Sequence, residues 1–158
     1  MRHKKAPKRI TEPDKIYKST LVAKFINRIM ADGKKATAEK IFYKALNNIK
    51  EKQNQEGIEI FEKAIQNVGP KIEVRPRRVG GASYQVPVEV RGDRKISLAM
   101  RWIITAAKAR SNKDFPSFSE KLAAELVDAI KNQGAAIKKR DTVQKQAEAN
   151  RAFAHFRW

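Results

Sequence analysis

The sequence predicts a mainly α-helical protein: a six-helix bundle with a protruding two-stranded β-ribbon between helices three and four, and basic N- and C-terminal tails. Two observations predict this fold. Apolar residues recur every three or four positions in five separate stretches, as they do on the buried face of a helix, and a sixth stretch is weakly amphipathic. Between the third and fourth stretches, the pattern changes to alternation around Gly80 and Gly81, which is typical of a β-hairpin.

The length of 158 residues suits one hydrophobic core. We expect a single helical domain over residues 19–149, with the hairpin at residues 71–91 inside it. A basic N-terminal tail at residues 1–18 and an aromatic and basic C-terminal tail at residues 150–158 would flank this domain.

The net charge of +18 is too high for an ordinary soluble enzyme, and it is unevenly spread. Residues 1–18 carry +5, residues 71–95 carry +4 and residues 131–158 carry +5. A charge that only kept the chain soluble would be spread evenly, so this concentration in the two ends and the ribbon indicates a binding surface. The predicted partner is a polyanion, nucleic acid first and an anionic membrane surface second.

The absence of cysteine excludes a disulfide framework and a thiolate zinc site, and it fits a reducing compartment. No apolar run approaches the ~20 residues that a membrane span needs. The opening residues MRHKKAPKR are not followed by an apolar segment, so we expect no secretory signal there.

Three helices are expected before the ribbon, at residues 20–30, 35–52 and 58–68. Asp32 and Gly33 should stop the first helix, because Gly33 suits the left-handed conformation of a C-cap. Gly69 and Pro70 should end the third.

The two strands of the ribbon are expected at residues 72–78 and 82–90. Gly80 and Gly81 supply the positive φ that a tight hairpin needs. If Arg78 faces Ala82 across a three-residue loop, each face of the ribbon carries one kind of side chain. One face would hold Ile72, Val74, Tyr84, Val86 and Val88, and the other Glu73, Arg75 and Arg77. Because prolines in both strands cannot donate to a ladder, we expect no larger sheet.

Three more helices are expected after the ribbon: one from Asp93 to Arg110, one that begins after Ser117, and one over residues 135–149. Asp93 can cap the fourth helix. Ser117 and Glu120 form a capping box for the fifth. Gly134 should separate the fifth helix from the weakly amphipathic sixth.

Arg94, Arg101 and Lys108 of the fourth helix are seven residues apart. Seven residues are nearly two turns, so the three charges share one face over ~21 Å. This row either follows a nucleic-acid backbone or is a solvated outer face, and the first is favoured because it continues the arginines of the ribbon. Trp102 either stacks on an unpaired base or belongs partly to the core, and the core is favoured.

The last eight residues, RAFAHFRW, interleave rings with charges. A free tail would not expose so many rings without a partner. The rings either fold back on the core or contact RNA or another protein, and the sequence favours neither. Lys138, Lys139 and Arg140 form a basic run that would by itself be a solvated face, and this tail strengthens its interpretation as a binding surface.

No residue pattern indicates catalysis, a metal or a cofactor. The two histidines, His3 and His155, are not accompanied by cysteine or by a carboxylate cluster. The phosphate-binding pattern GxxxxGK[ST] is absent, and no nucleophile with a base or pair of facing carboxylates stands out. We therefore expect neither an enzyme nor a bound metal or cofactor.

Four stretches resemble the bacterial small-subunit ribosomal protein seven family. They are RRVGGASYQVPVEVR at residues 77–91, AEANRAFAHFRW at 147–158, LAAELVDAIKNQGAAIKKR at 122–140 and FINRIMADGKK at 25–35. These motifs are long and specific, and the resemblance covers nearly the whole chain from about Tyr17.

The resemblance implies six helices with a protruding β-ribbon. It also implies primary binding to the 3′ major domain of 16S-type rRNA, nucleation of head assembly, and a place at the subunit interface near the exit-site tRNA and the decoding centre. The implied location is cytoplasmic, in the ribosome, with no membrane partner. Further implied partners are neighbouring small-subunit ribosomal proteins of the head and platform, and the chain's own mRNA.

Together with the basic positions above, the resemblance predicts two sets of site residues. Contacts to rRNA are expected at Lys4, Lys5, Lys8, Arg9, Lys34, Lys35, Arg75, Arg77, Arg78, Arg91, Arg94, Lys95, Arg101, Trp102, Lys108, Lys138, Lys139 and Arg140. Residues close to tRNA are expected to be Val79, Gly80, Gly81, Ala82, Ser83, Tyr84, Arg151, Arg157 and Trp158.

Two other classes of protein compete with this interpretation. A DNA-bending architectural protein also uses basic ribbon arms, but such arms usually carry apolar tips, whereas this tip is two glycines. It would prefer duplex DNA to structured RNA. A basic enzyme acting on RNA would need a site that the sequence does not show, and turnover by the purified protein would reveal it.

Overall fold

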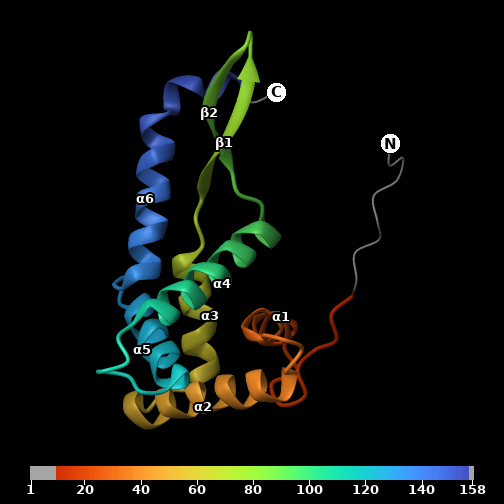
Figure 1. Ribbon diagram of the computed structural model, residues 1–158, viewed down its shortest axis with the longest axis vertical. Helices are drawn as coiled ribbons and strands as arrows, with labels where there is room; N and C mark the ends of the chain where they lie inside the picture. The colour runs from red at the N-terminus through yellow and green to blue at the C-terminus, as the bar shows by residue number, and fades with distance from the viewer. Residues whose placement is uncertain (1–9, 157–158) are drawn as a thin grey trace. The chain divides into compact units, whose positions relative to one another are not determined.

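A computed structural model describes residues 10–156 of the chain (Figure 1). Its residues cluster into two compact units, one that ends at Lys40 and one that begins at Ile41. Each unit is described by itself below. Within residues 10–156, no helix is both long enough and apolar enough to cross a membrane.

The first unit contains a turn at Asp14 and the helix α1 (Thr20–Ile29). The Asp14 carboxylate accepts hydrogen bonds from the backbone N–H groups of Ile16 and Tyr17, at 3.1 and 3.0 Å, which fixes the chain just before the helix. The apolar stripe of α1 is buried, as its spacing predicts. The chain then enters α2 (Lys35–Gln53), which continues into the second unit.

Gly33 was wrongly predicted as the C-cap of the first helix, because α1 ends earlier and Met30 is the cap residue. Its left-handed conformation is nevertheless present, with φ of +72° after +52° at Asp32. The two residues form the turn that leads into α2.

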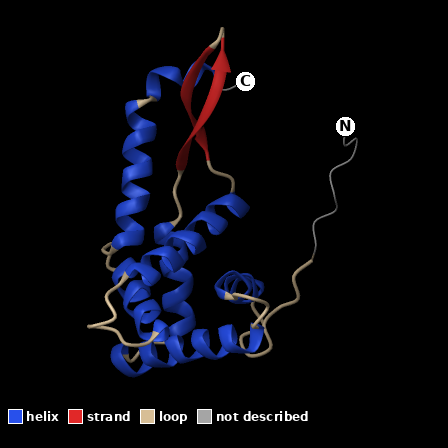
Figure 2. Cartoon of the chain, viewed as in Figure 1, coloured by secondary structure: helices blue, strands red, loops and turns tan. Residues whose placement is uncertain are grey.

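The second unit is built on three helices, α3 (Gly57–Val68), α4 (Gly92–Ala109) and α5 (Phe118–Ile130), which pack against one another (Figure 2). The rings of Phe42 in α2 and Phe61 in α3 meet edge to face, with their centroids 5.2 Å apart. The largest fully buried apolar side chains of this unit include Phe42, Leu46, Ile49, Phe61, Val68, Ile103, Leu122 and Leu126. The predicted helical core is thus confirmed.

The predicted ribbon is an antiparallel hairpin of β1 (Ile72–Val79) and β2 (Ala82–Glu89), and within the described residues it forms a sheet of two strands. Its predicted register is wrong by one residue. Val79 pairs with Ala82, so the loop contains only Gly80 and Gly81, both with positive φ. A one-residue slip moves every side chain of one strand to the other face.

As a result, the two faces of the hairpin mix apolar and charged residues. Tyr84 lies opposite Arg77, Val86 opposite Arg75, and Val88 opposite Glu73. Ile72 and Val74 share the other face with Glu89 and Pro87.

Helix α6 (Ala135–Ala149) has the predicted bounds and lies beside the hairpin, in contact with both strands (Figure 1). A short 3₁₀ helix, η1 (Arg151–Phe156), then packs against β2. The ring of Tyr84 lies 5.3 Å from that of Phe153 and 5.1 Å from that of Phe156. The rings of Phe153 and Phe156 therefore fold back against the hairpin.

Two helix N-caps were predicted in this unit, and the structure confirms one of them and contradicts the other. The Ser117 hydroxyl accepts a hydrogen bond from the backbone N–H of Glu120 at 3.3 Å, which confirms the predicted cap of α5. Asp93 was wrongly predicted as the cap of α4, because the helix already begins at Gly92 with Arg91 as its cap residue. Asp93 lies in the first turn, where a negative charge stabilises the helix.

A buried ionic network joins α4, α5 and α6. The Glu125 carboxylate is 1% exposed and accepts from the Arg110 guanidinium at 2.6 and 2.8 Å and from the Ala136 backbone N–H at 3.0 Å. Arg110 also bonds to Asp128. Burial lowers the pKa of Arg110, but its hydrogen bonds to Asp128 and Glu125 and their charges outweigh this, so the pKa is raised and the guanidinium stays charged.

Candidate nucleic-acid interface

Glu73 gathers two of the predicted RNA-binding arginines. Its carboxylate is nearly buried, and it accepts from Arg75 of its own strand at 2.6–2.7 Å. It also accepts from the Nε of Arg94 in α4, at 2.6 Å to one oxygen and 2.7 Å to the other. The two arginine side chains remain half exposed. Glu73 therefore links the hairpin to the first turn of α4 and holds both guanidinium groups at the surface.

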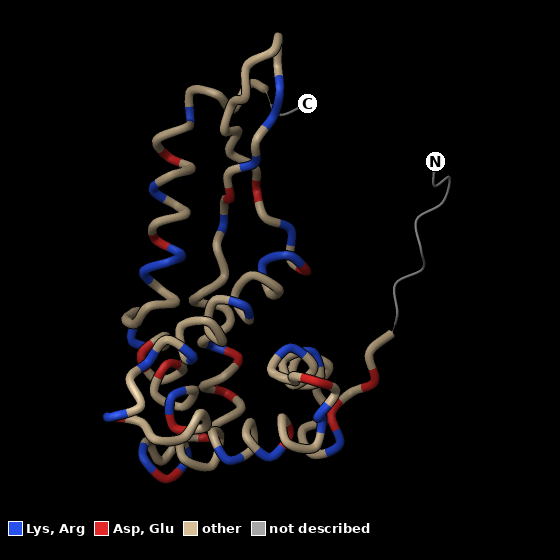
Figure 3. Tube along the Cα trace, in the orientation of Figure 1, with Lys and Arg blue, Asp and Glu red and all other residues tan. Residues whose placement is uncertain are grey.

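Other cations of the hairpin and α4 are exposed, and within residues 10–156 they make no ion pair: Arg77, Arg78, Arg91, Arg101 and Lys108. Basic residues recur along the hairpin and the start of α4 (Figure 3). Together with Arg75 and Arg94 we call these residues the cationic surface. Only Arg75 and Arg94 share a carboxylate, that of Glu73, so the surface keeps a large net positive charge that suits a polyanion.

Lys95 and Trp102 of α4 are half-buried. The methylene chain of Lys95 covers Gly69, where an added Cβ would come within 2.6 Å of it. The aliphatic part of Lys95 therefore packs against the end of α3, as long charged side chains often do. The partial exposure of Trp102 is compatible with both of its predicted roles.

The basic run of α6 divides in two. Lys138 and Lys139 are exposed, but Arg140 donates to the backbone carbonyl of Asn67 in α3 at 2.7 Å and to Asp141 at 2.8 Å. Arg140 thus satisfies a carbonyl in the last turn of α3, and it has a structural role whether or not it also contacts RNA.

The hairpin tip is largely exposed. Residues 80–83 are open to solvent, whereas Val79 and Tyr84 are half-buried. Arg151, at the start of η1, is exposed, as are Lys34 and Lys35 at the beginning of α2 in the first unit. The predicted residues Lys4, Lys5, Lys8, Arg9, Arg157 and Trp158 lie outside the described residues.

Two functional features could not be found from the sequence. The contact between Glu73 and Arg94 joins positions 21 residues apart and depends on the angle between the hairpin and α4. The ring cluster around Tyr84 depends on where η1 is placed. The alternating pattern predicted that Glu73 and Arg75 share one face of the hairpin, but it did not indicate that Arg94 of α4 would bind the same carboxylate.

The described part of the chain contains no group of three or more His, Cys, Asp or Glu side chains arranged to hold a metal ion. The main chemical feature of the second unit is the cationic surface. The second unit is therefore a helical scaffold that presents a positively charged hairpin.

Comparisons with known proteins identify the family. Residues 1–151 match the family described as ribosomal protein S7p/S5e. The chain is 57% identical over 158 residues to the small ribosomal subunit protein uS7 of Kosmotoga olearia, and the match covers 100% of both chains. It is 56% identical over 152 residues to the uS7 protein of Oleidesulfovibrio alaskensis, covering 96% of each.

The chain therefore belongs to the ribosomal protein S7p/S5e family. It is a structural, non-enzymatic constituent of the small ribosomal subunit in the cytoplasmic ribosome, and membership of this family implies binding to rRNA and to other ribosomal proteins. This membership confirms the family resemblance seen in the sequence, and it rules against the DNA-bending protein and the RNA-processing enzyme.

Proposed function

We propose that the chain is a primary binding protein of the 3′ major domain of 16S-type rRNA, that it nucleates assembly of the subunit head, and that it lies at the subunit interface near the exit-site tRNA and the decoding centre. The observation that carries the proposal is the cationic surface. Its arginines come from two elements that Glu73 fixes to each other, so the charges are presented to RNA in a set geometry.

The proposed mechanism is physical. Lysine and arginine side chains neutralise phosphates and release condensed counterions, which makes binding strongly dependent on salt. Specificity for a folded junction then comes from the shape of the rigid scaffold, because the deep groove of an RNA helix hides its sequence. Holding Arg75 and Arg94 against Glu73 lowers the entropy that ordering two long side chains would otherwise cost on binding.

Replacing Arg101 by Gln tests the proposed surface, because this exposed residue makes no ion pair with a described residue. We expect weaker binding to a folded 3′ major-domain fragment and a salt slope reduced by about one. Lys113→Gln is the matched control, since Lys113 is an exposed cation in the loop between α4 and α5. Equal effects of the two variants would mean that only total charge matters.

The hairpin tip is proposed to lie against exit-site tRNA rather than rRNA. Replacing residues 79–84 by a shorter glycine turn should leave head assembly intact and lower retention of exit-site tRNA. Loss of head assembly would reject this part of the proposal.

Binding to the chain's own mRNA is proposed on the cationic surface, and it predicts competition between that mRNA and the rRNA fragment.

A further inference from the structure

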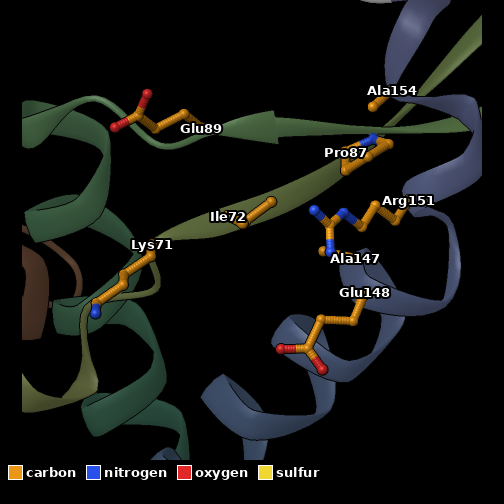
Figure 4. A pocket seen from close by; sticks show the side chains of 8 residues that line it. All are labelled: Lys71, Ile72, Pro87, Glu89, Ala147, Glu148, Arg151 and Ala154. Carbon is orange, nitrogen blue, oxygen red and sulfur yellow. The ribbon is translucent and has the colours of Figure 1, made fainter.

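A groove of about 590 Å³ opens between the base of the hairpin and the C-terminal end of α6. Its apolar lining comes from Ile72 and Pro87 on the hairpin and from Ala147 and Ala154 on α6 and η1 (Figure 4). Ile72 is one of the few large apolar side chains of the described chain that are exposed. A groove of this size and lining is suited to a flat, largely apolar group.

Charges of both signs surround this groove. Lys71 and Glu89 lie on the hairpin side, and Glu148 and Arg151 lie together on the side of α6 and η1 (Figure 4). Within residues 10–156, none of these four side chains forms an ion pair or a hydrogen bond. A ligand that matches this groove would have a flat body for the apolar walls, a negative group for the cations and N–H donors for the carboxylates.

An RNA nucleotide has these three features, and we infer that the groove binds an unpaired guanosine of RNA. This inference rests on the proposed function above. The base would lie between Ile72, Pro87 and Ala147. Arg151 would bind the phosphate, because a guanidinium matches phosphate oxygens. Unpaired bases, unlike paired ones, expose the edge that a protein can read.

Glu148 selects the base. The Watson–Crick edge of guanine carries two adjacent donors, N1–H and the 2-amino group, which match the two oxygens of a carboxylate. Adenine and cytosine present one amino donor beside an acceptor nitrogen, and uracil presents one N–H between two carbonyls, so each of them repels a carboxylate oxygen. Glu148 comes from the same wall as Arg151, whereas Glu89 comes from the hairpin on the other side of the groove (Figure 4).

A peptide strand from a neighbouring protein is the competing occupant. It would need a continuous row of backbone partners along β2, and Pro87 offers no N–H there. The unpaired carboxylate and guanidinium on one wall, three residues apart, fit a nucleotide better.

The test is a titration of the full chain with GMP, IMP, AMP, CMP and UMP, followed by NMR of the methyl groups of Ile72, Ala147 and Ala154. GMP should shift these methyl resonances and bind roughly tenfold tighter than AMP, since one bidentate base contact provides discrimination of this order. IMP, which lacks the 2-amino group, should bind with intermediate affinity. Glu148→Gln should remove the preference for GMP, because an amide has only one acceptor oxygen.

Glu62→Gln is the matched control, because Glu62 is an exposed carboxylate on α3 outside the groove. It should keep the preference for GMP. Equal binding of all five nucleotides, shifts confined to other methyl groups, or an unchanged preference in Glu148→Gln would overturn the inference. If the rRNA fragment binds specifically but GMP does not enter the groove, only this inference fails. If the fragment binds no better than scrambled RNA, the proposed function fails as well.

Discussion

Glu73 of the hairpin and Arg94 of α4 are joined by two hydrogen bonds, with the arginine Nε 2.6 and 2.7 Å from the two carboxylate oxygens. Arg75 bonds to the same carboxylate. A two-stranded hairpin is only marginally stable without a supporting element. Glu73 provides such support at the base of the hairpin, through two arginines whose side chains remain half exposed.

Replacing Glu73 by Gln should loosen the base of the hairpin. The amide cannot carry the charge that holds two arginines, so we expect a free energy of unfolding lower by about 1–2 kcal/mol in urea denaturation. Glu89→Gln is the control, because Glu89 lies at the same base of the hairpin, opposite Ile72, but is exposed and forms no ion pair within residues 10–156; it should change the free energy of unfolding by less than about 0.5 kcal/mol. A similar loss of unfolding free energy in both variants would show that the contacts of Glu73 with the two arginines stabilise the fold no more than an exposed carboxylate does.

Glu125→Ala should destabilise the second unit far more. The change leaves the Arg110 guanidinium with Asp128 alone and the Ala136 N–H without its acceptor. We expect a loss of about 3 kcal/mol in the free energy of unfolding. Glu62→Ala, which removes an exposed carboxylate on α3, should cost less than about 0.5 kcal/mol. A small loss at Glu125 would contradict its role in joining three helices.

The two glycines that begin α3 and α4 should respond in opposite ways to alanine. A Cβ at Gly57 would lie 2.7 Å from the Leu46 carbonyl oxygen, so Gly57→Ala should cost about 1–3 kcal/mol. A Cβ at Gly92 meets nothing within 4 Å, and Gly92→Ala should leave stability unchanged or raise it by about 0.4–1 kcal/mol. Urea unfolding of both variants checks the pair, and the same sign for both would contradict the packing.

Tyr84 should hold η1 against the hairpin. Tyr84→Ala removes both ring contacts, and amide hydrogen exchange in residues 151–156 should speed up by roughly 2–10-fold, as expected for a loss of about 0.5–1.5 kcal/mol. Tyr84→Phe keeps the ring and should exchange like the original chain. Unchanged exchange in the alanine variant would mean that η1 is held by other contacts.

Much of the fold could be predicted because local signals set it. Gly134 and Asn150 bracket α6, and its bounds match the prediction. The hairpin register could not be predicted, since loops of two and three residues around Gly80 and Gly81 were both compatible with the sequence. The pairing of Glu73 with Arg94 and the place of the C-terminal rings depend on tertiary geometry, which periodicity does not contain.

The candidate site was predictable as a set of charges but not as an arrangement. Clustering of lysine and arginine marked the hairpin and α4, and most of these residues are exposed. The same clustering also marked Arg140, although this residue bonds to the Asn67 carbonyl. Charge counting alone cannot separate a cation that holds the fold together from one that is left for a partner.

The most direct test of the central claim is binding of the full chain to a folded 3′ major-domain rRNA fragment across a salt series, beside a scrambled RNA and duplex DNA. We predict tight binding to the fragment that persists at salt concentrations where both controls have dissociated, because shape recognition adds to the salt-sensitive phosphate contacts. Equal affinities that fall together as salt rises would contradict the account and reduce the cationic surface to a general polyanion binder.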